Sequence, residues 1–335
     1  MLSYVLRRVA FSIIPFFGAT LIGFVLFRVM PGDPAVLMVG VGSSQAQIQQ
    51  MRAYLGENLP IYQQYFVWLH QIFTGNLGNS IFYAQPVSRV ILSRLPATLE
   101  LVLTATIIAL LVGVGIGVLS ALREGSKYDV TARSFSYVAF GIPDFIWGLL
   151  FILIFGSYLR IFPVSGRIDP FISFHSITGF FLPDSLIEGD IPALISVLDH
   201  LILPSLALAL ALMAIIQRTI RSSLAEVMQE DYIVTDRMKG LSETYVIYVR
   251  ALKNSLIPTI TILGVQFTFL MGGSILIEYI FGWPGLGSLI LNAIQYKDFP
   301  LMQGIVVLYA VVVILVNLVV DLLYSFLNPK IRYAR

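Results

Sequence analysis

The sequence predicts an all-α, polytopic integral membrane protein with six transmembrane helices, and three observations lead to this fold class. Of the 335 residues, 57% are hydrophobic and only 12% are charged. That is about half the charge of a soluble domain, so there is too little polar surface to coat a soluble globule. Six stretches are apolar over about 20 residues, the length that crosses a hydrocarbon core of about 30 Å. Unbroken apolar runs of this length suit helices, which satisfy their own backbone groups in lipid, rather than barrel strands.

The six predicted spans are 9–29, 98–121, 135–159, 198–217, 258–281 and 302–326. The first has no small-residue cleavage site after it, so we expect an uncleaved span rather than a signal peptide. In the third span, Ile142-Pro143 predicts a kink. Glycines predict close helix packing in the second and fifth spans. They are Gly113, Gly115, Gly117, Gly264, Gly272 and Gly273.

The orientation of the spans follows from the basic residues, which gather on the cytoplasmic side of membrane proteins. With the N-terminus inside, the inner segments hold most of the 21 lysines and arginines. The short segment 121–134 and the C-terminal tail both follow this rule. We therefore predict a multi-pass protein of the cell membrane with both termini in the cytoplasm.

Two outer regions are too long to be simple turns. In the first, 30–97, apolar residues recur at helical spacing in 45–55 and 61–73, which predicts amphipathic helices lying on the membrane or on the protein. The second, 160–197, is rich in Phe, Ile, Pro and Asp but shows no clear period.

Several kinds of site are excluded by residue content. There are no cysteines, which excludes disulfide scaffolds, iron–sulfur clusters and thiolate zinc sites. The 3 histidines lie far apart and form no HExxH motif, and there is no GxSxG elbow. The dipeptide Gly-Lys is absent, so there is no phosphate-binding P-loop and any ATP hydrolysis would need another chain. A net charge of +2 implies no nucleic-acid partner.

The polar stretch between the fourth and fifth spans is predicted to be a helix, a sharp corner and a second helix. Residues 224–239 contain helix formers without proline or glycine. Gly240 then suits a positive φ at the helix end, Ser242 suits a helix N-cap, and Glu243 suits the first turn. The second helix is expected to run toward Leu256, with Pro258 starting the fifth span.

This stretch could be an ordinary solvated loop, but a structured corner favours a contact with a partner. Beside its charges it presents apolar Tyr232, Ile233, Val234 and Met238. Burying a few such side chains in a groove of a soluble partner would contribute about 1.5–3 kcal/mol each.

The corner resembles the "EAA" motif of ABC importer permeases of the dipeptide/oligopeptide/nickel family. The matching residues are Asp231, Tyr232, Thr235, Arg237, Lys239, Gly240, Leu241 and Ser242, whereas Asp236 and Met238 stand where alanines are usual. Six further segments resemble the family in the same order. They are PGDPA (31–35), RLPATLEL (94–101), GIPDF (141–145), EYIFGWPGLG (278–287), DFP (298–300) and NPKIRY (328–333). The long first outer region resembles the B-type subunit of the permease pair.

The resemblance implies a type I ABC importer permease fold and a set of partners. These are a second homologous permease subunit of the C-type, two ATP-binding subunits, an extracytoplasmic binding protein and the lipid bilayer. ATP and Mg²⁺ would bind to the ATP-binding subunits, so we expect no cofactor and no catalytic residue on this chain. The coupling helix that contacts the ATPase would comprise Glu230, Asp231, Tyr232, Thr235, Asp236, Arg237, Lys239, Gly240, Leu241 and Ser242. The expected cargo is peptides, with oligosaccharides or nickel complexes as alternatives.

The resemblance also suggests a division of the chain: residues 1–93 hold the first span and the long outer region, 94–326 the core with the coupling loop at about 218–257, and 327–335 the tail. Candidate residues of the translocation path are Asp144, Phe267, Met271 and Glu278. Intramembrane carboxylates are costly, so Asp144 either lines the path or bonds to a neighbouring helix.

Other polar and aromatic residues in the spans favour structural roles. We expect Asp321, one turn after Asn317, to be structural or at a subunit interface. We expect Glu278 and Arg28 to extend toward the membrane surface, and Trp283 to anchor at that surface. Two other classes of protein are possible from composition alone. One is an ion-coupled carrier that relays charge through Asp144, Glu278 and Asp321, and the other is an intramembrane hydrolase, which the missing motifs disfavour.

Overall fold

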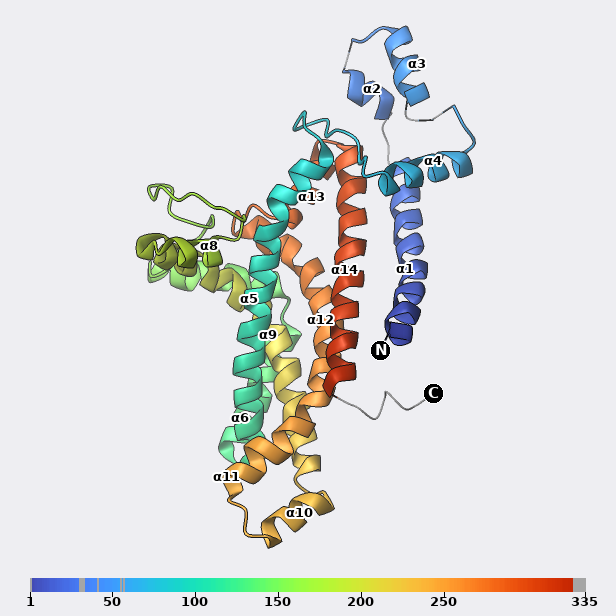
Figure 1. Ribbon diagram of the computed structural model, residues 1–335. Helices are drawn as coiled ribbons and strands as arrows, with labels where there is room; N and C mark the ends of the chain where they lie inside the picture. Colours follow the sequence, from blue (N-terminus) through green and yellow to red (C-terminus); the bar gives the residue numbers. More distant parts are fainter. Residues whose placement is uncertain (1, 30–33, 41, 55, 57, 328–335) are drawn as a thin grey trace. The chain divides into compact units, whose positions relative to one another are not determined.

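The computed structural model describes residues 2–29, 34–40, 42–54, 56 and 58–327 (Figure 1). Within these ranges the chain is helical, and its only extended pairing is an isolated bridge between Asn79 and Pro86. The elements in order are α1 (Leu2–Val29), α2 (Pro34–Val39), α3 (Gln45–Tyr54), α4 (Ile61–Phe73), α5 (Val87–Leu122), α6 (Lys127–Gly141), α7 (Asp144–Phe151), η1 (Ile152–Tyr158), α8 (Phe181–Glu188), α9 (Ile191–Val227), α10 (Asp231–Met238), α11 (Glu243–Tyr245), η2 (Val246–Ala251), α12 (Leu252–Ile280), α13 (Leu286–Gln295) and α14 (Phe299–Leu327).

The predicted spans correspond to long apolar helices. Four helices are long and apolar enough to cross a membrane: 87–122, 191–227, 243–280 and 299–320. The pair α6 and α7–η1 passes the same test together, and α1 contains a shorter apolar stretch, Phe11–Val25. The all-α membrane fold with about six spans is thus confirmed. The helices of the second and fourth spans extend well beyond their predicted ends.

The third span is not the single helix that was predicted over 135–159. Helix α6 ends at Gly141, α7 begins at Asp144, and the two parts are bent by 102°. Pro143 explains the bend, because it lacks a backbone N–H and pushes the preceding residue out of the helical region. Ile142 accordingly has φ −102° and ψ 128°. The expected kink is confirmed, and it places Asp144 at the corner rather than inside a straight helix.

The helix before the fifth span is continuous, which corrects the expected start at Pro258. Residues 243–280 form one helix with a π-helical stretch at η2, and Pro258 lies inside it. The second helix of the predicted corner and the fifth span are therefore parts of one rod. The segment 160–197, which showed no period, contains α8, and α8 ends at Gly189 with φ 68°.

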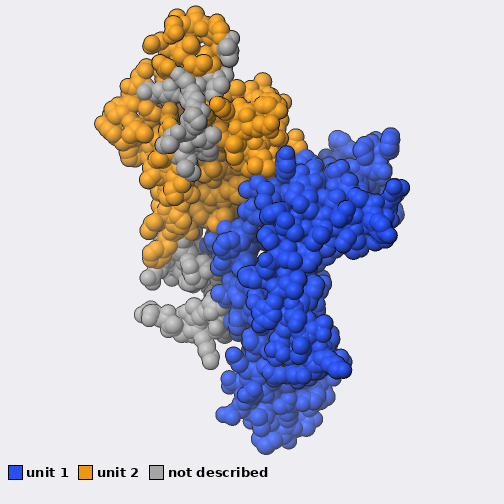
Figure 2. Space-filling view, turned by 180° about the vertical axis from the view of Figure 1, so that it is seen from behind, with its two compact units in different colours: residues 1, 97–284, 316–335 blue, residues 2–96, 285–315 orange. Residues whose placement is uncertain are grey.

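The chain's contacts cluster into two compact units (Figure 2). Unit 1 contains Ala97–Pro284 and the part of α14 that begins at Val316; unit 2 contains Leu2–Pro96 and Gly285–Leu315. The long helices α5 and α14 each contribute to both units.

In unit 1, helix α5 packs closely on α9 through two of the predicted glycines. A Cβ on Gly117 would lie 2.9 Å from the carbonyl oxygen of Gln217, and one on Gly113 would lie 3.0 Å from that of Met213. Gly115 faces open space instead. Small residues four apart thus allow backbone contact between helices, as in other membrane proteins.

The loop between η1 and α8 is attached to α5 by a buried ion pair. The Arg167 guanidinium lies 2.5 Å from Glu100 and 3.7 Å from the centroid of the Phe181 ring, at the start of α8. Glu100 also accepts a hydrogen bond from the backbone N–H of Leu182. Asp184 on α8 accepts hydrogen bonds from Ser176 and Thr178. Burial of Asp184 opposes its ionisation, but these hydrogen bonds outweigh burial and hold the pKa of its carboxyl below the usual range.

Two residues expected near the membrane surface are instead fully buried. Trp283 is not an exposed anchor, because its indole N–H donates to the carbonyl of Ala97 at 2.9 Å and its side chain is 0% exposed. Glu278 does not extend to the surface. Its carboxylate accepts hydrogen bonds from Thr98 at 2.7 Å and Ser274 at 3.3 Å. Both side chains have polar partners inside the helix bundle, which compensates for their burial.

In unit 2, helix α4 packs on α1, and α13 packs on α5 and the first half of α14. The helices predicted at 45–55 and 61–73 are confirmed as α3 and α4. The Asp298 carboxylate is buried and accepts hydrogen bonds from the Ser80 hydroxyl and the Phe82 backbone N–H. The Phe82 ring stacks on Tyr296 with centroids 4.0 Å apart. The DFP segment therefore fastens the loop after α4 to the corner between α13 and α14.

Candidate functional site

The predicted corner between the fourth and fifth spans forms a separate short helix, α10. Residues 224–239 were expected to be one helix, but α9 ends at Val227 and the backbone turns at 228–230 before α10 begins. The turn reorients the chain so that Ile233 is buried, with 0% exposure, although the sequence suggested that it faces a partner. After α10, Gly240 has φ 77°, and the Ser242 hydroxyl accepts a hydrogen bond from the Tyr245 N–H. The corner at Gly240 and the cap at Ser242 are confirmed.

Helix α10 is fastened to the following helix by buried and polar contacts. Asp236 is 3% exposed, and its carboxylate lies 2.7 Å from the Nε of Arg250 in η2. The Asn254 amide donates to the Tyr232 hydroxyl at 2.8 Å. The unusual aspartate at 236 therefore belongs to the inner face of α10, where Arg250 is its partner, and not to the surface that a groove would contact. Arg250 was not identified from the sequence as part of this site.

The outer face of α10 is solvent-exposed and mixes apolar side chains with charges. Met238 is 77% exposed, Val234 44% and Leu241 39%. Most of the predicted coupling residues share this exposure, namely Glu230, Asp231, Thr235, Arg237, Lys239, Gly240, Leu241 and Ser242. An exposed apolar cluster on a fixed helix is suited to binding another protein.

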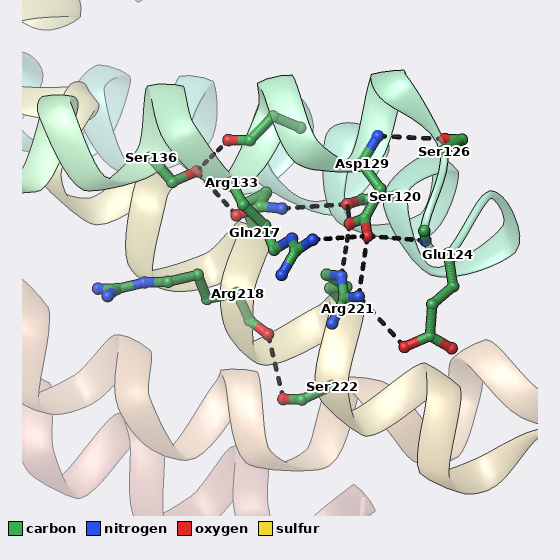
Figure 3. A network of polar contacts seen from close by, with 12 residues as sticks. Ser120, Glu124, Ser126, Asp129, Arg133, Ser136, Gln217, Arg218, Arg221 and Ser222 are labelled. Carbon is green, nitrogen blue, oxygen red and sulfur yellow. Dashed lines mark hydrogen bonds and ion pairs between the residues drawn. The ribbon is translucent and has the colours of Figure 1, made fainter.

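A buried polar network holds α9 shortly before α10 begins (Figure 3). Asp129 of α6 is 0% exposed, and the Arg221 guanidinium of α9 binds both its oxygens, at 2.6 and 2.9 Å. The Ser120 hydroxyl of α5 and the Gly125 N–H donate to the same carboxylate. The hydrogen-bonded Arg221 is the main reason that the pKa of the Asp129 carboxyl lies well below its usual range. The pair is therefore charged at neutral pH and joins three helices.

The network continues along α9 toward the middle of the bundle. Gln217 accepts a hydrogen bond from the Ser136 hydroxyl of α6 at 2.7 Å, and its amide lies 3.5 Å from the Ser120 hydroxyl. This network was not predicted from the sequence. An acid and a base 92 positions apart give no local signal.

The predicted path residues lie in two places. Phe267, Met271 and Glu278 share one face of α12, and all three are buried, with 9%, 1% and 0% exposure. Asp144 is half-buried at the start of α7, and its Oδ2 would lie 3.2 Å from a Cβ on Gly273 of α12. Among the described residues, none forms a hydrogen bond or ion pair with the Asp144 carboxylate. The roles of these four residues in a path stay predictions, and the side chain of Asp321 lies outside the described part.

Among the described residues, no three acidic or histidine side chains lie close enough together to bind a metal ion. Unit 1 instead presents the exposed short helix α10 between two long helices, α9 and 243–280. The buried ion pair between Asp129 and Arg221 lies on α9 shortly before α10.

Comparison with known proteins identifies the family. Residues 113–333 match the family described as the inner membrane component of binding-protein-dependent transport systems, and residues 1–102 match its N-terminal region. The chain belongs to this family. A permease of this family is a transport component and not itself an enzyme, which rules out the intramembrane hydrolase, and its dependence on a binding protein argues against an ion-coupled carrier.

Full-length relatives of this permease are known in several bacteria. It is 41% identical to a di/tripeptide transport system permease protein of Pseudomonas aeruginosa, over 100% of both chains. It is 38% identical to an oligopeptide transport system permease protein of Bacillus subtilis, over 99% of this chain and 100% of that protein. The fold resembles a solved chain of the MetNI methionine ABC transporter in an inward-facing conformation, with a TM-score of 0.50 and 16% identity over 69% of this chain and 93% of that chain.

Proposed function

We propose that this permease forms half of the membrane pathway of an ATP-driven importer that takes up peptides. The cargo is inferred from the relatives, which are named as transporters of di-, tri- and oligopeptides. An extracytoplasmic binding protein would deliver the peptide, and a homologous permease subunit of the C-type would complete the pathway. Two ATP-binding subunits would supply the energy, with ATP and Mg²⁺ bound to them. Both termini of this chain would lie in the cytoplasm.

Helix α10 would be the coupling helix. The observation that supports this role most is that one face of α10 exposes apolar side chains while its other face is attached to the following helix. Val234, Met238 and Leu241 are exposed, while Ile233 and Asp236 bind the helix to its neighbour. Burying the exposed side chains in a groove of an ATP-binding subunit would contribute about 1.5–3 kcal/mol each. A helix held this way transmits displacement to α9 and to the rod 243–280 instead of bending.

Transport would then be a two-state change biased by ATP. When the ATP-binding subunits close, α10 would move with them, and the permease would switch between inward- and outward-facing states. The absence of a P-loop from this chain agrees with that division of labour.

Substitution of Gly240 tests the coupling role. Its φ of 77° is unfavourable for a β-branched residue, and a Cβ there would meet no atom within 4 Å. The strain of Gly240→Val is thus confined to the corner. We expect this variant to insert, to assemble and to retain ATP hydrolysis, but to lose uptake. The matched control is Gly240→Asn, because asparagine tolerates positive φ, and it should keep most uptake. Normal uptake by well-expressed Gly240→Val would refute the coupling role.

The cargo is tested separately with the reconstituted complex and its binding protein. Labelled di- and tripeptides should accumulate inside proteoliposomes in an ATP-dependent way. Accumulation of oligosaccharides or nickel complexes, with no accumulation of peptides, would refute the peptide assignment but leave the coupling role intact.

A further inference from the structure

Helix α4 crosses α1, and its contacts lie within the apolar stretch of α1, Phe11–Val25 (Figure 1). The Tyr65 hydroxyl lies 3.0 Å from that of Thr20, and the Phe73 ring lies 6.1 Å from that of Phe16. Thr20 lies five residues before the end of the apolar stretch, which is about 7–8 Å along a helix. Because α1 is the first span, these contacts place α4 below the membrane surface and not in the water beyond it.

The sequence of α4 suits this depth. Between Ile61 and Phe73 it contains no aspartate, glutamate, lysine or arginine. Charged side chains are costly inside a membrane, whereas Tyr and Trp are enriched where the acyl chains meet the headgroups. Tyr65 and Trp68 both occur in this helix, and their rings pack on the Phe24 ring of α1.

The surface of α4 that faces away from α1 has an aromatic side. The side chains of Tyr62, Phe66 and Phe73 are 60%, 66% and 67% exposed. At 3.6 residues per turn, these three positions lie within about 40° of one another around the helix. Gln63 and His70 are also exposed, but they lie next to this aromatic side and not within it.

The aromatic side and the opposite side of α4 face different ends of α1. On the aromatic side, Phe73 lies beside Phe16, which is nearer the middle of the span. On the opposite side, Gln64 and Gln71 line the same cavity as Arg28, one residue before the end of α1. The aromatic side of α4 is therefore directed toward the middle of the membrane, and the glutamine side toward its surface. This is the orientation of an amphipathic helix in the membrane interface.

We propose that α4 is embedded in the leaflet at the C-terminal end of α1, with Tyr62, Phe66 and Phe73 among the lipid acyl chains. Interfacial helices bury their apolar face about 5–10 Å below the headgroup boundary, and the depth of Thr20 falls in this range. Lipid is the favoured occupant because α1 exposes Ile14 and Ile22, 71% and 62%, to the surroundings at similar depths. The sequence left open whether 61–73 lies on the membrane or on the protein, and the proposal assigns one side of α4 to each. It depends neither on the coupling role of α10 nor on the cargo.

Spin labels on single cysteines test the proposal, because the chain has no native cysteine. Phe66→Cys, Phe73→Cys and Gln63→Cys would be labelled in the full-length chain, assembled with its partner subunits in lipid bilayers. Collisions with oxygen, which concentrates among acyl chains, are compared with collisions with a water-soluble nickel chelate. The labels at 66 and 73 should favour oxygen, as should the reference label at Ile14→Cys on α1, and the label at 63 should be shifted toward the chelate. Preference for the chelate at all three α4 positions would place α4 in water, and protection from both reagents would mean that another protein covers it. Either result would overturn the proposal.

A matched pair of charge substitutions tests the same placement through the stability of α4. Phe66→Glu puts a carboxylate among acyl chains, whereas Gln63→Glu puts one beside the headgroups. Phe66→Glu should accelerate hydrogen exchange of the backbone amides of α4 about tenfold in bilayers, and Gln63→Glu should leave it close to the wild-type rate. The melting temperature of the complex shows whether the rest of the fold is intact. Equal exchange rates in the two variants would contradict an acyl-chain environment for Phe66.

Discussion

The ion pair between Arg221 and Asp129 gives the sharpest stability prediction. In Arg221→Met the Asp129 carboxylate loses two charge-assisted hydrogen bonds, at 2.6 and 2.9 Å, while it remains 0% exposed. Removing one partner of a buried pair costs about 3–5 kcal/mol. Arg133 remains 3.4 Å from the same carboxylate, and the Arg221 side chain is itself 18% exposed. We therefore expect a loss at the lower end, about 3 kcal/mol of unfolding free energy.

Arg218→Met is the matched control for this experiment. Arg218 lies three residues earlier on α9. It donates to the carbonyl of Ala214 in its own helix, and its guanidinium lies 5.0 Å from the Phe140 ring and 5.8 Å from the Tyr137 ring. Loss of such a cation–π contact costs about 0.5–1 kcal/mol. The assay is equilibrium unfolding of the purified chain in mixed micelles at neutral pH. At that pH the pair is charged, because the pKa of the Asp129 carboxyl is lowered in the folded protein. The contribution of the pair to stability is therefore complete above the unfolded pKa of about 4, and it is lost as the pH falls through the folded pKa.

The double variant Asp129→Asn/Arg221→Met separates the pair energy from other effects. It should cost less than the sum of the two single variants, because the second substitution removes the unpaired charge that the first leaves behind. Equal stability of Arg221→Met and the wild type, or equal losses from Arg221→Met and Arg218→Met, would refute the assignment of this pair as the junction of α5, α6 and α9.

Three further substitutions probe other parts of unit 1. Gly117→Val should lower stability by about 1–3 kcal/mol, because its side chain would meet α9 within 2.9 Å, whereas Gly115→Val faces open space and should not; similar melting temperatures of the two variants would contradict the close packing. Asp236→Asn should reduce uptake per ATP hydrolysed, because it weakens the attachment of α10 to Arg250, while Glu243→Gln at the exposed pair with Arg237 should leave this ratio unchanged; the ratio in proteoliposomes is the readout. Asp144→Asn should change the uptake rate of peptides with a free amino group if its carboxylate faces the path, and an unchanged rate with a lower melting temperature would assign it a structural role.

Much of the fold could be predicted because its signals are local in sequence. Apolar length located the long helices, Pro143 predicted the bend, and Gly240 with Ser242 predicted the corner and the cap of the next helix. Amphipathic spacing located α3 and α4. Each of these features depends on residues within a few positions of one another, where propensity and capping decide the backbone.

The errors concern residues whose environment is set by distant parts of the chain. Trp283 and Glu278 looked like residues of the membrane surface because they follow a long apolar run, yet their partners are Ala97 and Thr98 on another helix. Ile233 looked exposed because charges flank it, but the turn at 228–230 directs it inward. No sequence pattern marks such pairings.

The corner motif was recognised from its residues, but its inner and outer faces were not distinguished. Asp236 stands where the family usually has an alanine, and the structure pairs it with Arg250 on the inner face of α10. The division of the chain at residues 93 and 326 stays a prediction. The matching segments 31–33 and 328–333 lie outside the described residues.

Single-cysteine crosslinking tests the coupling role of α10 most directly, because the chain has no native cysteine. Met238→Cys places the thiol at a position that is 77% exposed on α10, and Phe171→Cys places it at one that is 96% exposed in the loop between η1 and α8, which the predicted orientation puts outside the cell. In inside-out vesicles that contain the assembled complex, Met238→Cys should crosslink to an ATP-binding subunit with an efficiency that changes with nucleotide, and Phe171→Cys should not. Labelling of Met238→Cys from outside intact cells, or a crosslink from Phe171→Cys alone, would contradict the account.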